Sequence, residues 1–174
     1  MSRRFRDVLG NFPTSVVAIT TTDGEDRPHG MIVGTFTSVS LDPPLVSFLA
    51  DRSSATLREI RAAGRFCAGA LAGNQERLSR KLASGPAGQR FDGTNWRTSS
   101  LGNPVLDGVV AWVDCTIEQV VEIGDHLLVV GRVHDLRAES PATPLLFFRG
   151  GYGDYLSSAG PLLDSLVGWH EIGR

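Results

Sequence analysis

Hydroxyl side chains gather between residues 30 and 56 of this 174-residue chain. The segment Gly34–Ser40 carries four of them in seven residues. Three more hydroxyls and two arginines surround the expected start of a helix: Arg52, Ser53, Ser54, Thr56 and Arg58. A helix N-terminus offers unbonded N–H groups and a partial positive charge, which suit a phosphate, and arginine adds charge-assisted hydrogen bonds. The pattern favours an anion site, and its structural alternative is a polar strand face followed by an ordinary helix cap.

Two other places combine polar groups with a turn. His126 follows the two-residue link Gly124–Asp125 and opens a strand-like run. Arg149 and Tyr152 enclose two glycines, and Gly153 follows. Glycines give the backbone conformational freedom beside the cation and the aromatic ring. Each place is equally compatible with a surface turn, so neither indicates a function by itself.

Motifs of acid–base and nucleophilic catalysis are missing from the sequence. It holds no G-x-S-x-G elbow, no P-loop and no G-x-G-x-x-G after a first strand, and its carboxylates are scattered. It also lacks C-x-x-C and H-E-x-x-H, so we expect no metal site. Cys67 and Cys115 lie in apolar runs and are interpreted as small buried hydrophobic residues. Chemistry that a bound cofactor performs for itself remains open.

Length and charge narrow the class of protein. A chain of this length fits one domain. Its 17 basic and 19 acidic residues are interspersed and leave a net charge of −2, without the basic stripe of a nucleic-acid-binding surface. The sequence shows no membrane-spanning stretch, and its N-terminus lacks the apolar core of an export signal. We therefore expect a cytoplasmic protein that binds neither nucleic acid nor membrane.

Segments rich in β-branched residues dominate the chain. Strands are expected over Thr14–Thr21, Met31–Val39, Leu45–Ala50, Arg65–Leu71, Val109–Ile123, His126–Leu136 and Leu145–Phe148. Short helices are expected over Phe5–Phe12, from Ser53 or Ser54 to Gly64, and from Asn74 to Leu82, before a glycine-rich loop over 84–93. The two-residue link 124–125 predicts a long hairpin. The predicted class is mainly β, with the sheet closed or nearly closed to hide its edges.

In their order along the chain, six motifs resemble those of the flavin reductase-like family. They are Phe36–Val46, Asp51–Thr56, Ala62–Phe66, Pro104–Gly108, Gly124–His126 and Phe148–Tyr152. The resemblance implies an FMN-binding split β-barrel with a few short peripheral helices over residues 1–156, followed by a C-terminal tail over 157–174. It also implies a homodimer with one flavin per subunit near the interface, and reduction of FMN or FAD by NADH or NADPH. Many members of the family pass the reduced flavin to a separate monooxygenase.

The resemblance also assigns roles to individual positions. Along one strand, Met31, Ile32, Val33, Gly34 and Thr35 would line the flavin ring, followed by Thr37 and Ser38. The flavin phosphate would be held by Arg52, Ser53, Ser54 and Thr56. Ser84 and Phe91 match a loop that touches the distal part of the flavin, while His126, Arg149 and Tyr152 would lie on the nicotinamide side. His126 is the candidate catalytic residue, which would orient the nicotinamide or shield the site.

The chain departs from the family pattern at two positions. The family usually has Thr and Asn where this chain has Ile32 and Gly34, so two hydrogen-bonding side chains near the flavin ring are lost. The leading hypothesis is a flavin reductase that positions nicotinamide against flavin, a task that needs no protein acid or base. Ile32 and Gly34 would make the flavin pocket roomier and more apolar, which favours the alternative of a flavin-dependent oxygenase acting on an organic substrate. An apolar tail around 162–169 favours a third, a non-enzymatic flavin-binding or docking module.

Overall fold

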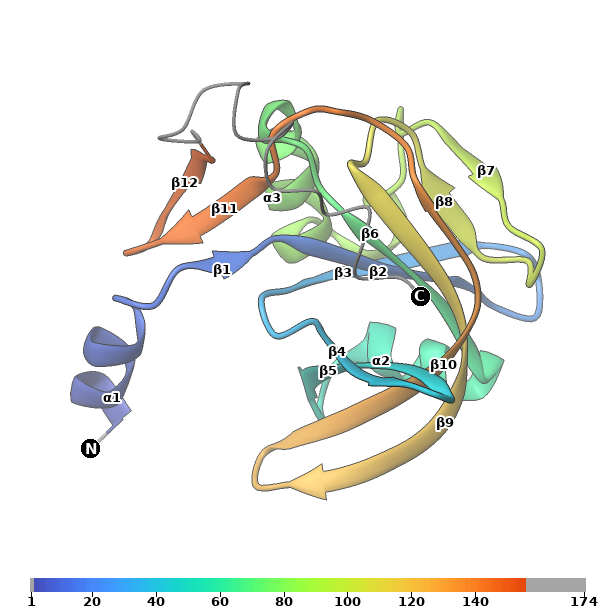
Figure 1. Ribbon diagram of the computed structural model, residues 1–174, viewed down its shortest axis with the longest axis horizontal. Helices are drawn as coiled ribbons and strands as arrows, with labels where there is room; N and C mark the ends of the chain where they lie inside the picture. The colour runs from blue at the N-terminus through green and yellow to red at the C-terminus, as the bar shows by residue number, and fades with distance from the viewer. Residues whose placement is uncertain (1, 156–174) are drawn as a thin grey trace.

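Strands make up about half of the computed structural model, which describes residues 2–155 (Figure 1). The strands are β1 (Thr14–Ser15), β2 (Val17–Thr22), β3 (Pro28–Val33), β4 (Thr37–Leu41), β5 (Pro44–Asp51), β6 (Arg65–Ala70), β7 (Trp96–Thr98), β8 (Pro104–Leu106), β9 (Ala111–Ile123), β10 (His126–Ala138), β11 (Leu145–Phe148) and β12 (Gly151–Asp154). The helices are α1 (Ser2–Leu9), α2 (Ala55–Ala63) and α3 (Glu76–Ser84), with short 3₁₀ helices η1 (Gly73–Gln75) and η2 (Ala87–Gln89).

One seven-stranded antiparallel sheet carries the fold. Its order is β3-β2-β6-β9-β10-β5-β4, so β3 and β4 are its two edge strands. The long hairpin of β9 and β10 bends around the body of the molecule and brings the two ends of the sheet toward each other (Figure 1). The gap between them is bridged by Thr35, whose hydroxyl donates to the carbonyl of Leu49 at 3.1 Å and accepts from its amide at 2.9 Å. The sheet is therefore a barrel that is split between β3 and the β4–β5 pair.

Two hydrophobic clusters lie on opposite faces of this sheet. On β2, Val17 and Ile19 belong to the first cluster, and the intervening Ala18 belongs to the second, as the two-residue period of a strand requires. The first cluster fills the barrel, where the rings of Phe48 and Phe66 meet edge to face at 5.2 Å. The second lies under α3 and the small β7–β8 sheet and includes Leu82. The split barrel is thus packed on both sides of its wall.

Helix α2 forms where the sequence predicts it. Ser54 caps its N-terminus by accepting from the amide of Leu57 at 3.2 Å, and Gly64 ends it in a left-handed conformation with φ of 67°. Leu57 and Ile60 are buried against the barrel core. This packing fixes the first turn of α2 beside β3, because Thr56 donates to the carbonyl of Gly30 at 3.4 Å.

Most predicted elements are confirmed, and several boundaries differ. The strand expected over Met31–Val39 is two strands, β3 and β4, which separate at Gly34–Phe36 as the chain crosses the split. The helix expected from Asn74 begins as η1 and becomes α3 at Glu76. Strands β7, β8 and β12 were not predicted, because each is short and has little alternation. The mainly β class with short peripheral helices is confirmed, whereas the predicted tail over 157–174 lies outside the described residues.

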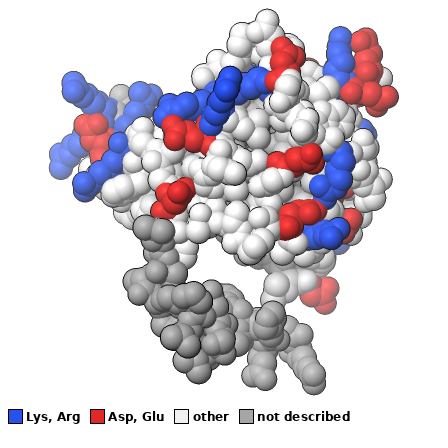
Figure 2. All heavy atoms as spheres, turned by 90° about the horizontal axis from the view of Figure 1, so that it is seen from above, with Lys and Arg blue, Asp and Glu red and all other residues white. Residues whose placement is uncertain are grey.

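The surface of the described residues is mixed in charge. Figure 2 shows Lys and Arg side chains lying close to Asp and Glu side chains over much of one face. Ion pairs such as Arg132 with Glu118 and Arg80 with Glu76 keep opposite charges adjacent. Within residues 2–155, no helix is long and apolar enough to cross a bilayer.

Candidate functional site

A cavity of about 230 Å³ opens between the start of β3 and the first turn of α2. It is lined by His29, Gly30, Ser54, Ala55, Thr56, Glu59, Ala87 and Arg90. The first amides of a helix have no intrahelical partner, so those of Ala55 and Thr56 are available at this wall. Helix start, hydroxyls and a guanidinium are the groups that bind a phosphate. The anion site predicted from the sequence therefore has a hollow beside it.

Arg90 supplies the cation of this cavity. Its Nη1 donates to the hydroxyl of Thr56 and to the carbonyl of Gly30, each at 3.1 Å, and its Nε donates to the carbonyl of Gly85 at 2.9 Å. These bonds hold the guanidinium in one place at the helix start. Sequence reasoning missed Arg90, although it stands next to Phe91, and a lone arginine in a glycine-rich loop was the only available signal.

His29 also lines the cavity, and its side chain contacts the carboxylate of Asp23. Its Nε2 lies 3.0 Å from Oδ2 of Asp23, which also accepts from Nε of Arg27 at 2.9 Å. These contacts, with His29 contributing most, hold the pKa of the Asp23 carboxyl well below its usual range. His29 was not singled out in the sequence, because its partner lies across the β2–β3 turn and no local pattern marks the pair.

Two of the predicted phosphate ligands face elsewhere. Ser53 turns back to Asp51, whose Oδ1 accepts from the Ser53 hydroxyl at 2.7 Å and from its amide at 2.8 Å. Both bonds lower the pKa of Asp51. Arg52 is exposed and does not line the cavity, and its amide donates to the carbonyl of Asp125 at 3.2 Å. Of the four predicted ligands, the structure brings Ser54 and Thr56 to the cavity.

His126 lies at the tip of the β9–β10 hairpin, next to this loop. It is paired in register with Asp51, and its Nδ1 is 2.7 Å from Oδ1 of Asp125. The histidine lowers the pKa of Asp125 through that contact. The hairpin tip and the segment 51–53 therefore lie next to each other, and none of these residues lines the cavity.

The end of β3 borders a second hollow, of about 150 Å³. Ile32, Val33, Gly34 and Tyr152 are predicted residues among its walls, and Thr14, Ser15, Val16 and Phe147 complete it. Because β3 is an edge strand, one side of its backbone has no neighbouring strand. Met31 packs against the barrel core, and the hydroxyl of Thr35 is occupied by Leu49. Thr37 and Ser38 are exposed on β4.

The remaining predicted residues already have protein partners. The hydroxyl of Ser84 donates to the carbonyl of Arg80 in its own helix at 2.9 Å, and Phe91 packs on the second cluster. The Tyr152 hydroxyl lies 2.9 Å from the Ser79 hydroxyl. Arg149 donates from Nε to Asn11 at 2.8 Å, beside the end of α1. Within one chain, β12 and the hairpin tip bearing His126 lie at well-separated places (Figure 1), so His126 does not meet Tyr152 there.

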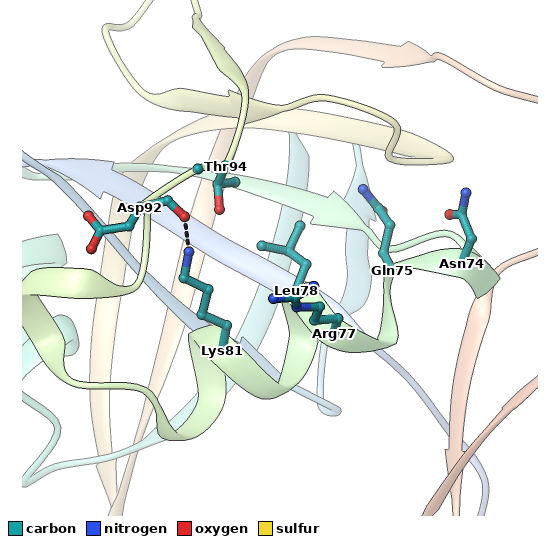
Figure 3. Close-up of a pocket in the computed structure, with 8 residues that line it drawn as sticks. Asn74, Gln75, Arg77, Leu78, Lys81, Asp92 and Thr94 are labelled. Atoms are coloured by element: carbon teal, nitrogen blue, oxygen red, sulfur yellow. Dashed lines mark hydrogen bonds between the residues drawn. The ribbon is translucent and has the colours of Figure 1, made fainter.

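A larger hollow of about 490 Å³ lies between α3 and the loop 92–94 (Figure 3). Two of its polar side chains are bonded to the protein. Lys81 donates to the carbonyl of Asp92, and Gln75 accepts from the amide of Ala72 and donates to the carbonyl of Asp107. None of the predicted site residues lines it, so its size alone does not make it the site.

The chain matches known proteins over most of its length. A family model described as "Flavin reductase like domain" matches residues 9–155. A flavin reductase of Pseudomonas putida is 48% identical over 151 residues, covering 87% of this chain and 88% of the relative.

Two solved structures share the fold. Nitrilotriacetate monooxygenase component B from Mycobacterium thermoresistibile superposes with a TM-score of 0.84 at 41% identity, covering 89% of this chain and 87% of that one. The Streptomyces globisporus NADH:FAD oxidoreductase SgcE6, solved with NAD and FAD fragments, gives 0.84 at 30% identity, covering 91% and 94%. The resemblance drawn from the six motifs is confirmed, and this chain belongs to the flavin reductase-like domain family.

Proposed function

We propose that this protein is an NAD(P)H:flavin oxidoreductase that transfers hydride from NADH or NADPH to FMN or FAD. The observation that carries the proposal is the cavity beside α2, where Thr56 and Arg90 stand at a helix start next to the edge strand β3. That arrangement places groups suited to binding an anion next to the backbone edge of β3. The family membership and the flavin reductases among its relatives support the same activity.

The residues of the cavity fit a flavin phosphate. Ser54 and Thr56 lie at the helix start, and Nη2 of Arg90 makes no hydrogen bond within residues 2–155. Backbone groups on the edge of β3 would face the ring and replace the side chains lost at Ile32 and Gly34. N–H donors fixed there would stabilise the negative charge that reduction builds on the ring. A bound flavin would supply the redox ring that accepts the nicotinamide hydride, and one proton from solvent would balance the reduction.

His126 remains the residue proposed to orient the nicotinamide or to shield the site. Its contact with Asp125 holds the imidazole at the hairpin tip, beside Arg52 and Ser53. Arg149 and Tyr152 are also proposed for the nicotinamide side, and Tyr152 borders the hollow at the end of β3. These roles need positioning of two rings, which in favourable cases contributes up to roughly 7–11 kcal/mol.

A homodimer is proposed as the functional unit. Four large apolar side chains on and just after α1 are exposed: Phe5, Val8, Leu9 and Phe12. An apolar helix face of this kind is typical of an interaction surface, and a second copy of the chain would cover it. Sedimentation of the purified protein tests this directly. A single monomeric species at micromolar concentration would contradict it.

Reduced flavin released by this protein is proposed to serve a partner monooxygenase. The structural relative named nitrilotriacetate monooxygenase component B is a component of such a system, which supports the proposal. The cytoplasmic location expected from the sequence stays a prediction.

The direct test mixes purified protein with NADH or NADPH and either FMN or FAD, and follows the nicotinamide absorbance band. We expect oxidation with at least one flavin well above the rate without protein. Anaerobic flavin spectra should show bleaching that matches the nicotinamide consumed. Oxidation no faster than the protein-free rate with both flavins would overturn the proposal.

A further inference from the structure

The side chain of Thr35 stands where a strand backbone would continue the sheet. Strands β4 and β5 pair in antiparallel register, with Thr37 opposite Ser47. Extending that register by two residues puts position 35 opposite Leu49. The chain has left the ladder there, and the Thr35 hydroxyl instead accepts from the Leu49 amide at 2.9 Å and donates to its carbonyl at 3.1 Å. One hydroxyl thus makes the pair of bonds that a backbone partner makes in an antiparallel ladder, and we call this pair the Thr35 latch.

The latch leaves the main chain of the crossing segment 34–36 without protein partners. Within residues 2–155, the backbone N–H groups of Gly34, Thr35 and Phe36 make no hydrogen bond. An N–H group without a protein partner bonds to water or to a ligand. Gly34 and Thr35 are exposed, and Gly34 lines the hollow of about 150 Å³ at the end of β3. The segment therefore offers hydrogen-bond donors beside that hollow.

Each residue of the crossing segment is also held in place by a contact of its own. Gly34 lies against Thr14, because a Cβ added at Gly34 would come within 2.8 Å of the Thr14 hydroxyl. Thr35 is tied to Leu49, and Phe36 packs against the barrel core. Donors that are fixed before a ligand binds can stabilise a developing charge without reorganising. Amides that are free but fixed suit a ring whose charge changes during a reaction.

We propose that Thr35 is a positioning residue for hydride transfer, because its latch aims the free amides of segment 34–36 at the flavin ring. The inference rests on the proposed flavin reductase function. Reduction adds negative charge to the ring, so amides fixed by the latch bind reduced flavin more tightly than oxidised flavin. The hydroxyl acts through the backbone, since its hydrogen is already donated to Leu49.

The latch itself can be tested in the flavin-free protein by the hydrogen exchange of the Leu49 amide, followed by NMR. Thr35→Val keeps the branched shape and removes both bonds, whereas Thr35→Ser keeps the hydroxyl. We expect Leu49 to exchange about twofold to tenfold faster in Thr35→Val, as the loss of one hydrogen bond implies, and near the wild-type rate in Thr35→Ser. An unchanged rate in Thr35→Val would show that the latch does not protect Leu49, and the inference fails.

The positioning role is tested by the Kd values of oxidised and reduced flavin, whose ratio sets the midpoint potential of the bound flavin. We expect Thr35→Val to weaken the binding of reduced flavin about threefold to tenfold more than that of oxidised flavin. Because a tenfold change in a two-electron equilibrium corresponds to 29.6 mV, the potential should fall by about 15–30 mV. Thr35→Ser should restore the wild-type potential.

Thr116→Val is the matched control. It also removes the hydroxyl of a threonine in a strand of the same sheet, because Thr116 of β9 lies 2.7 Å from Nε2 of His134 on β10. Thr116 does not line the hollow at the end of β3. The control should leave both the Leu49 exchange rate and the flavin potential unchanged. A shift in potential as large as that of Thr35→Val would contradict a specific role of the latch.

The two measurements together separate positioning from its alternatives. Faster Leu49 exchange with an unchanged ratio of Kd values would leave the latch with a structural role alone. A changed ratio with unchanged exchange would mean that the hydroxyl touches the flavin directly. Either result overturns the inference.

A second pair of variants serves if Thr35→Val does not fold. Thr35→Ser and Thr35→Cys have the same shape, and the thiol is the weaker donor and acceptor. We expect the lower flavin potential in Thr35→Cys, and equal potentials in the two variants would contradict the proposal. A wild-type protein that binds neither FMN nor FAD would instead overturn the proposed function, while the Leu49 exchange would still report on the latch.

Discussion

The start of α2 and the β11–β12 turn carry similar residue types and use them differently. At α2, Arg90 bonds Thr56 at a cavity wall and retains an unbonded nitrogen within the described chain. At the turn, Arg149 is exposed and donates to Asn11, while Tyr152 bonds Ser79 of α3. Thr56 and Arg90 line one hollow together, whereas in the second pair only Tyr152 borders a hollow and both side chains fasten β12 to its neighbours. An arginine beside a hydroxyl group therefore indicates a binding site only where the fold leaves space next to it.

Removing the cation should produce the largest difference between the two regions. Arg90→Ala is expected to raise the Kd of FMN and FAD about tenfold to a hundredfold, because a charge-assisted hydrogen bond contributes about 1.5–3 kcal/mol. Arg90→Lys should recover part of that affinity, and Arg149→Ala should leave it within about twofold. Fluorescence titration of each variant gives these values. Equal losses of affinity in Arg90→Ala and Arg149→Ala would remove the distinction.

Gly34, which follows β3 and lies beside Thr14 of β1, is expected to tolerate added side-chain volume poorly. A Cβ added at Gly34 would lie 2.8 Å from Oγ1 of Thr14, so Gly34→Ala should destabilise the protein by about 1–3 kcal/mol. Gly153 on β12 has open space around it, and Gly153→Ala serves as the control. Urea denaturation measures both. Thr14→Ala combined with Gly34→Ala should recover part of the loss, and an additive double variant would argue against the contact.

Two neighbouring hydroxyls at the start of α2 should differ in their effect on flavin binding. Thr56 bonds Arg90 at the cavity, while Ser53 bonds Asp51. Thr56→Val is expected to weaken flavin binding about twofold to tenfold, as expected for one lost hydrogen bond, and Ser53→Ala should leave it unchanged. Titration with FMN separates them. A larger effect from Ser53→Ala would restore the phosphate role that the sequence assigned to Ser53.

The smallest effect of a substitution is expected at Tyr152. Its variants distinguish a purely structural role from a role in binding the nicotinamide. Tyr152→Phe and Ser79→Ala each remove the same hydrogen bond and should lower the free energy of unfolding by about 0.5–1.5 kcal/mol. If Tyr152 also contacts the nicotinamide, Tyr152→Phe will raise the KM for NADH while Ser79→Ala will not. Steady-state kinetics on both variants decides this. Identical KM values in the two variants and the wild type would leave Tyr152 with a structural role alone.

Local chemistry allowed much of the fold to be predicted. Ser54 and Gly64 are a cap and a stop signal, and both lie where the helix begins and ends. The link 124–125 joins two long strands, and Leu145–Phe148 is a strand with the predicted bounds. These features depend on backbone preferences and on short-range hydrogen bonds, which neighbouring residues express directly. The order of motifs along the chain was likewise enough to predict the family.

What only the tertiary structure decided is which side chains meet over long distances in sequence. Arg90 reaches Thr56 across 34 residues, Tyr152 reaches Ser79 across 73, and Arg149 reaches Asn11 across 138. No local pattern marks such pairs, because each depends on how the sheet curls and where its split lies. The sequence alone determined that a helix would begin near Ser54 with hydroxyl groups and arginines beside it. Only the packing of β3, α2 and the loop after α3 determined which cation stands beside it and how much space is left for a ligand.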